Sequence, residues 1–255
     1  KRSQHRFDLL NINYIYVPWK SENFKAYLEN LTDRNSILIK SYEDQLIVRM
    51  GYSYNYNSAN DQTRTSSNRN SYSIRVNLEE AGNLLYGISK TIHTTPKEDK
   101  GYVMANIPFA QYVKGDFDFA HNWNIDKRNS FVFHIGMGIA YPYGNSQVLP
   151  FEKRYFSGGP NSVRGWSVRS LGPGSYKGTD GNMNYINHSG DIKLDLNIEY
   201  RTHLFWKFNG AAFIDAGNIW NIREYEGQEE GTFRFNHFYK QLAVAYGLGI
   251  RFDLD

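Results

Sequence analysis

The strongest constraint on the fold of this chain is a two-residue alternation of apolar and polar side chains that continues over long runs. From Ile192 to Arg201, apolar residues occupy every second position, and charged or amide residues lie between them. Phe131–Tyr141 and Leu242–Asp255 repeat the pattern. Looser versions occur at Phe7–Val17, Leu46–Tyr56, Tyr72–Leu78, Met104–Phe119 and Ala211–Ile219. Because successive side chains of a strand point to opposite faces, the chain is predicted to be all-β, with about eight strands.

A soluble β-sandwich and a membrane β-barrel both produce this alternation, so strand length and composition must separate them. Several runs exceed the usual five or six residues, and about 9–11 residues are needed to cross a bilayer at a tilt. The polar face is rich in glycine, alanine, asparagine and charge, as a water-filled lumen would be, and tyrosine and tryptophan gather near the ends of the runs. These features favour an antiparallel transmembrane β-barrel.

The connections between the predicted strands alternate in length. Ile125–Ser130 and Thr202–Lys207 are short, whereas Pro142–Gly190 and Ile219–Gln241 are long. Barrels of outer membranes show this alternation of tight turns and large outer loops. Ser58–Ser71 fits less well, since it is long and polar but falls on the short-turn side. A short amphipathic helix is predicted at Phe24–Leu31, inside the first long connection.

Composition excludes several other classes of protein. The chain has no cysteine, which rules out disulfides and thiol chemistry. Its net charge of +3 is spread without a basic block, so nucleic acid is not expected as a partner.

The segment Tyr155–Gly174 stands out among the connections. It is rich in glycine, yet it places Arg164 and Trp166 on either side of Gly165. A plain linker needs neither an arginine nor a tryptophan among glycines, so the segment is expected to pack against the rest of the protein.

The amino-acid sequence of this segment resembles that of the sixth extracellular loop of the Omp85 superfamily of outer-membrane barrels, with Val163-Arg164-Gly165-Trp166 as its centre. Two later segments resemble the family strands that follow, in order: Asn197-Ile198-Glu199-Tyr200 and Phe213-Ile214-Asp215-Ala216-Gly217. Trp166 departs from the commoner phenylalanine or tyrosine but keeps an aromatic ring. Together with Leu171-Gly172-Pro173-Gly174, the loop sequence most resembles that of BamA- and TamA-like members of the family in the Bacteroidota.

The resemblance implies a role for Arg164. In the family, the loop folds back into the barrel lumen, and its arginine meets acidic residues of the inner wall, which here are Glu199 and Asp215. Alternation independently puts both carboxylates on the polar face. A guanidinium between two carboxylates forms directional bonds that lysine cannot reproduce. The other positions that match the family pattern are Gly158 and Gly159 of the loop, and Phe213 and Gly217 of the strand.

The resemblance also implies an architecture larger than this chain. Family barrels have about sixteen strands and follow periplasmic POTRA domains. Residues 1–255 are therefore expected to be one partial barrel of about eight strands with a long loop inserted in its lumen, lacking the POTRA domains and the terminal strands.

The expected function is insertion and folding of other proteins in the outer membrane of a Gram-negative bacterium. The expected partners are the lipid bilayer, unfolded outer-membrane proteins and accessory lipoproteins. An alternative within the superfamily is a secretion pore, or a TamA-like factor that serves a restricted set of substrates. A diffusion channel, an outer-membrane enzyme and a soluble binding module are the rivals from other classes.

Few residues offer chemistry of their own. No nucleotide-binding, serine-hydrolase or zinc-protease motif occurs. Asp118 and His121 lie close in sequence near a strand end and are interpreted as a polar pair at the barrel rim. Asp180–Asn184 lacks the glycine and glutamate of a calcium loop. His134 is expected to point inward without a second metal ligand. No catalytic residue, cofactor or metal is predicted.

Overall fold

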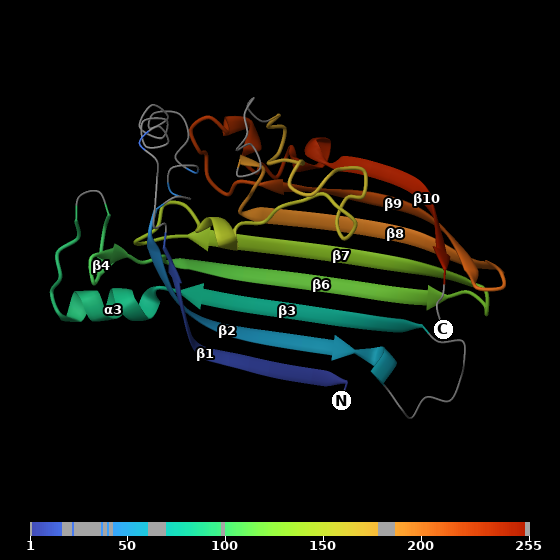
Figure 1. Cartoon of the computed structure of the whole chain (residues 1–255), viewed down its shortest axis with the longest axis horizontal. Helices are drawn as coiled ribbons and strands as arrows, with labels where there is room; N and C mark the ends of the chain where they lie inside the picture. The colour runs from blue at the N-terminus through green and yellow to red at the C-terminus, as the bar shows by residue number, and fades with distance from the viewer. Residues whose placement is uncertain are drawn as a thin grey trace.

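A computed structural model describes residues 2–16, 22, 37, 40, 43–60, 70–97, 100–177 and 187–252. Eight long strands form one antiparallel sheet in the order β1-β2-β3-β6-β7-β8-β9-β10 (Figure 1). The strands are β1 (Ser3–Ile15), β2 (Gln45–Asn57), β3 (Ser71–Ala81), β6 (Tyr112–Asn124), β7 (Asn129–Pro142), β8 (Ile192–Phe205), β9 (Phe208–Trp220) and β10 (Ala243–Phe252). Each long strand pairs antiparallel with its neighbours among the long strands, as the predicted fold class requires.

The register of the strands separates two faces of the sheet. On β8, Ile198 pairs with Phe133 of β7, whereas the next residue, Glu199, pairs with Val132 on the other face. We call the face that carries Glu199 the inner face and the opposite face the outer face. Large apolar residues of the outer face are solvent-exposed, among them Ile135, Met137 and Ile139 of β7, Ile214 of β9, and Val244, Tyr246, Leu248 and Ile250 of β10. The β7–β8 connection covers the inner face, whereas on the outer face Val48 near the loop end is buried against Leu85 and Phe109 of the β3–β6 connection.

Short and long connections lie at opposite ends of the sheet, as the sequence indicated. The β6–β7 and β8–β9 connections are tight turns, and the long β7–β8 connection lies at the other end, which we call the loop end (Figure 1). Short 3-10 turns punctuate the connections at Ser58–Asn60, Phe151–Lys153, Glu229–Gly231 and Phe238–Gln241.

The strand predicted at Met104–Phe119 is wrong in its first half. Val103–Met104 (β4) and Ile107–Pro108 (β5) form a separate two-residue hairpin, and the long strand β6 begins at Tyr112. Ala105 and Asn106 between β4 and β5 both have positive φ, which closes a tight turn and interrupts the extended chain. Helix α3 (Asn83–Thr91), in the same β3–β6 connection, was not predicted.

Two predicted features lie outside the described residues: the helix at Phe24–Leu31 and the loop Asp180–Asn184. None of the helices among the described ranges is long and apolar enough to cross a membrane.

The largest buried cluster lies between the inner face and the β7–β8 connection. Its members come from five strands, from the end of the β3–β6 connection and from the β7–β8 connection: Ile47, Ala81, Ala110, Tyr112, Ala140, Leu149, Tyr155 and Ile219. The main core of the described chain therefore joins the connection to the inner wall near the loop end.

Candidate functional site

Arg164 lies in a turn of the β7–β8 connection, where the backbone N–H of Trp166 donates to the carbonyl of Val163 at 3.2 Å. Its Nε and Nη2 donate to the two carboxylate oxygens of Asp215 at 2.7 and 2.8 Å. Its Nη1 donates to Glu199 at 2.5 Å, and its backbone N–H adds a bond to Asp215 at 3.1 Å. The structure thus brings the loop arginine to both carboxylates of the inner wall.

The surroundings favour a charged guanidinium. Its central carbon lies 3.5 Å from the centroid of the Phe213 ring, which gives a cation–π contact beside the ion pairs. The hydrogen bonds that its side chain donates to Asp215 are the main reason that the pKa of Arg164 lies above its ordinary range. The fork uses three nitrogens on two acids, a geometry that a single ammonium cannot supply.

The two carboxylates differ in their environments. The Asp215 side chain is fully buried and also accepts a bond from Asn197 Nδ2 at 2.8 Å. The Glu199 side chain accepts bonds from Arg201 at 2.7 Å and Arg251 at 2.5 Å in addition to the bond from Arg164. Glu199 therefore connects the loop to strands β8 and β10, while Asp215 connects it to β9 and, through Asn197, to β8.

Glycines at the contact let the loop approach the wall. A Cβ atom on Gly165 would lie 2.8 Å from the Cβ of Ala245 on β10, and one on Gly217 would lie 2.5 Å from the carbonyl oxygen of Leu194. In the loop, Gly158 and Gly159 have φ values of 94° and 91°, a conformation that disfavours any side chain.

An apolar contact completes the seat of the motif. Val163 is fully buried and packs with Leu171 of the loop and Ala245 of β10, and Trp166 lies partly buried beside them. Ser162 donates to the buried carboxylate of Asp195 at 2.7 Å. The motif Val163–Trp166 is thus fixed by ion pairs, hydrogen bonds and packing at once.

Sequence reasoning missed a second set of loop anchors, which lie nearer the loop end. Lys153 Nζ is 2.7 Å from Glu79 of β3, and the Tyr155 hydroxyl donates to Asp116 of β6 at 2.6 Å. Burial raises the pKa of Tyr155 above its usual range. A Cβ on Gly138 of β7 would lie 2.5 Å from the Tyr155 ring, so this strand glycine makes room for the loop.

A fully buried ion pair joins the two ends of the β7–β8 connection, and hydrogen bonds link it to the β9–β10 connection. Arg154 Nη1 lies 3.1 Å from Asp191, and both side chains have 0% exposure. Arg154 also donates to Asn221 at 2.6 Å, and the Tyr225 hydroxyl donates to Asp191 at 3.1 Å. Burial, followed by the charge of Asp191, raises the pKa of Tyr225. The signal in the sequence was Lys153-Arg154-Tyr155, two cations and an aromatic residue directly before the glycine-rich segment.

Asp118 and His121 are not a pair. They lie three residues apart on β6, so alternation sends them to opposite faces, and Asp118 instead accepts from His134 at 2.8 Å. The other ring nitrogen of His134 contacts Asn197 Oδ1 at 2.7 Å. Within the described ranges, no group of three or more histidine, aspartate or glutamate side chains is arranged to hold a metal ion.

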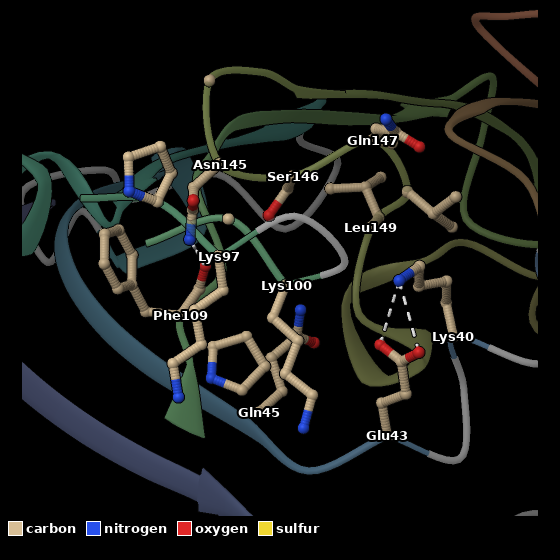
Figure 2. A pocket seen from close by; sticks show the side chains of 15 residues that line it. Lys40, Glu43, Gln45, Lys97, Lys100, Phe109, Asn145, Ser146, Gln147 and Leu149 are labelled. Carbon is tan, nitrogen blue, oxygen red and sulfur yellow. Dashed lines mark hydrogen bonds and ion pairs between the residues drawn. The ribbon is translucent and has the colours of Figure 1, made fainter. Parts of the chain in front are cut away.

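A pocket of about 420 Å³ lies at the loop end, between the start of β2, the β3–β6 connection and the β7–β8 connection (Figure 2). Lys40 and Glu43 at its edge form an ion pair of 3.1 Å. Asn145 accepts from the Tyr102 backbone N–H at 2.7 Å and donates to the Phe109 carbonyl at 2.9 Å. These polar groups already satisfy one another and hold the two connections together.

Comparison with protein families decides the membership of this chain. The model of the Omp85 superfamily domain matches residues 8–254, nearly the whole sequence. The chain belongs to the Omp85 superfamily. The described sheet and this match confirm the predicted fold class, an antiparallel sheet that forms part of an outer-membrane β-barrel.

Curated relatives are similar at modest identity. The chain is 29% identical over 123 residues to the outer membrane protein assembly factor BamA of Neisseria meningitidis, covering 43% of this chain and 15% of that protein. It is 27% identical over 157 residues to the human sorting and assembly machinery component 50 homolog, covering 60% of this chain and 32% of that protein. The chain thus spans less than a third of the length of either relative.

Among solved structures, the crystal structure of BamA from Haemophilus ducreyi lacking POTRA domains 1–3 is similar, with a TM-score of 0.42 and 14% identity. The similarity covers 86% of this chain and 50% of that chain.

Proposed function

We propose that this chain forms part of the barrel of an assembly factor that folds and inserts β-barrel proteins into the outer membrane of a Gram-negative bacterium. Membership of the Omp85 superfamily and the similarity to an outer membrane protein assembly factor support this function. In this proposal, unfolded outer-membrane proteins are the substrates, and accessory lipoproteins are further partners.

The distribution of exposed side chains supports a membrane location. The outer face of the sheet presents a continuous apolar surface to its surroundings. Aromatic residues border this surface at both ends: Trp123, Phe205 and Trp206 near the short turns, and Tyr14, Tyr16 and Tyr141 near the loop end. We assign the outer face to the hydrocarbon core of the bilayer and the two aromatic rows to its interfaces.

The observation that carries the proposal is the clamp formed by Arg164, Asp215 and Glu199 across the inner face. The clamp uses the residues that match the motif of the superfamily, and it leaves no group free to react with a substrate. In our proposal, these residues hold the loop inside the lumen and keep the wall in the shape that assembly requires. Loop and wall together then act as a rigid frame.

Depletion of the protein in its host tests the proposal. We expect the abundance of several unrelated barrel proteins in the outer membrane to decrease together, as measured by quantitative proteomics of that membrane. A plasmid copy of the wild-type gene should restore them. If the other barrels stay at normal levels and one exported or lipidated client disappears, the proposed general role is wrong, and a dedicated translocation or TamA-like role takes its place.

A further inference from the structure

The β3–β6 connection carries helix α3 on the outer side of the barrel rim, a position that the lumen loop does not explain. Leu85 of the helix is buried in a cluster with Val48 and Phe109. Val48 belongs to the outer face of β2, because its neighbour Ile47 is buried in the inner-face cluster. The helix therefore packs over the outer edge of the sheet, beyond the ends of β3 and β6 (Figure 1).

The side of α3 next to this contact is apolar and uncovered. Leu84, Ile88 and Ile92 are 48%, 40% and 64% exposed. They are spaced by four residues, so they form one stripe along the helix and its C-cap. The exposed residues on the opposite side are Asn83 and Lys90, whereas Gly87 and Thr91 flank the stripe beside Leu84. The helix is thus amphipathic, and its apolar stripe stays between 40% and 64% exposed in the described protein.

The amphipathic helix is held firmly in this orientation. Gly82 precedes it with φ of 85°, and a Cβ there would lie 2.2 Å from the carbonyl oxygen of Ala110. Asn83 accepts bonds from Gln111 at 2.8 Å and from the Tyr143 hydroxyl at 3.0 Å. The exposure of the stripe is therefore built into the fold of the rim.

The stripe continues the apolar outer face of the sheet. At the strand ends below the helix, Met50 pairs with Glu80, Glu80 with Val113, and Val113 with Tyr141, which places them in one cross-strand row on the outer face. Met50, Val113 and Tyr141 are each more than 40% exposed. Glu80 accepts a bond from the Asn83 backbone N–H at 3.0 Å, so the row touches the start of the helix.

The polar side of the helix suits the boundary between lipid and water. Lys90 Nζ lies 5.6 Å from the Tyr86 ring centroid and 5.4 Å from the Tyr102 ring centroid. An amphipathic helix with a cation and tyrosines above an apolar stripe is the kind that lies in the plane of a membrane interface.

We propose that α3 is an interfacial anchor, lying in the outer-leaflet boundary between headgroups and acyl chains, with Leu84, Ile88 and Ile92 inserted among the acyl chains. This inference rests on the proposed function, because it requires the outer face of the sheet to face lipid. The helix then extends the membrane contact of the wall laterally, and it fixes the height at which the rim sits in the bilayer.

Site-directed spin labelling tests the anchor, and the absence of native cysteine from this chain lets one introduced cysteine carry the label. The test position is Ile88→Cys. Lys90→Cys is the control on the polar side, because Lys90 is exposed and lies two residues, or about 200° around the helix, from Ile88. Leu248→Cys on the outer face of β10, where the native side chain is 87% exposed, is the reference for lipid contact.

The protein is reconstituted into vesicles of phosphatidylethanolamine and phosphatidylglycerol, and the accessibility of each label to oxygen and to a water-soluble nickel chelate is measured. We expect the oxygen-to-nickel ratio at Ile88 to lie within about twofold of Leu248 and at least about fivefold above Lys90. A ratio at Ile88 equal to that at Lys90, or a label shielded from both reagents, overturns the anchor while the barrel assignment stands. If Leu248 is also accessible to nickel rather than oxygen, the proposed membrane function itself is wrong.

Discussion

Asp215 shows at the scale of one residue why the loop needs an arginine. Its carboxylate is fully buried, and its partners are the guanidinium and backbone of Arg164 and the amide of Asn197. A buried charge without a partner carries a large desolvation penalty. The position opposite Asp215 is therefore suited to a cation with several donors in one plane.

Replacing Arg164 should loosen the loop. We expect Arg164→Ala to destabilise the protein by about 3–5 kcal/mol, because Asp215 stays buried without its cation. Arg164→Lys should destabilise the protein less than Arg164→Ala does, but should leave it less stable than the wild-type protein. Urea unfolding in vesicles measures the loss of stability, and proteolysis measures the exposure of the loop. The amounts of barrel proteins in the outer membrane of the host report assembly activity, and they should decrease. Arg128→Ala in the exposed β6–β7 turn is the control, and wild-type assembly activity in Arg164→Ala would refute the proposed role of the clamp.

Gly138 offers a test of how closely the loop sits on the wall. A methyl group there would lie 2.5 Å from the Tyr155 ring, so Gly138→Ala should cost about 1–3 kcal/mol of stability. Gly249→Ala is the matched change on another strand, because its new methyl group meets no atom within 4 Å. Equal unfolding midpoints for the two variants would show that Tyr155 is not seated against β7.

At the scale of the element, the β7–β8 connection behaves as a packed part of the structure. Its apolar residues Leu149, Tyr155 and Val163 are buried, and its cations meet acids supplied by three different strands or by its own end. Irregular backbone at membrane depth is tolerated where it is buried in protein or lines a water-filled cavity, and this connection is buried against the inner face.

The buried pair Arg154–Asp191 should be the strongest single ion pair at the base of this connection. We expect Asp191→Asn to destabilise the protein by about 3–5 kcal/mol, because it leaves the Arg154 cation buried without its counter-ion. Glu43→Gln breaks the half-exposed pair with Lys40 and should cost less than about 1 kcal/mol. Urea unfolding of both variants in vesicles measures the two losses of stability. Similar losses would contradict the expectation that the buried ion pair contributes more than the half-exposed one.

At the scale of the whole molecule, the loop joins strands that are far apart in the sheet. Lys153 reaches Glu79 on β3, and Arg164 reaches Asp215 on β9, with three strands between them. The inner face is thus held together by the loop as well as by the strand ladder.

A double-mutant cycle tests whether the loop is seated as one unit. Lys153→Ala and Arg164→Ala are measured singly and together by urea unfolding. If the loop detaches from the inner face as a whole, the second substitution should lower the free energy of unfolding less in the double mutant than it does in the wild-type protein. The reason is that the first substitution has already broken the contact of the second residue. Strictly additive losses would show that each anchor holds only its own segment.

The sequence by itself determined the number of long strands, the approximate position of each except the start of β6, their inner and outer residues, and the loop motif with its two acidic partners. These features follow from the two-residue alternation and from short sequence motifs, and both are patterns of residues that are close together in the sequence. Only the tertiary structure decided the anchors Lys153, Arg154 and Tyr155, the helix α3 and the pairing of Asp118 with His134. Their partners lie on other strands, at separations set by strand register and by the path of the loop. The helix was hidden because its nine residues are few and its apolar stripe faces away from the protein.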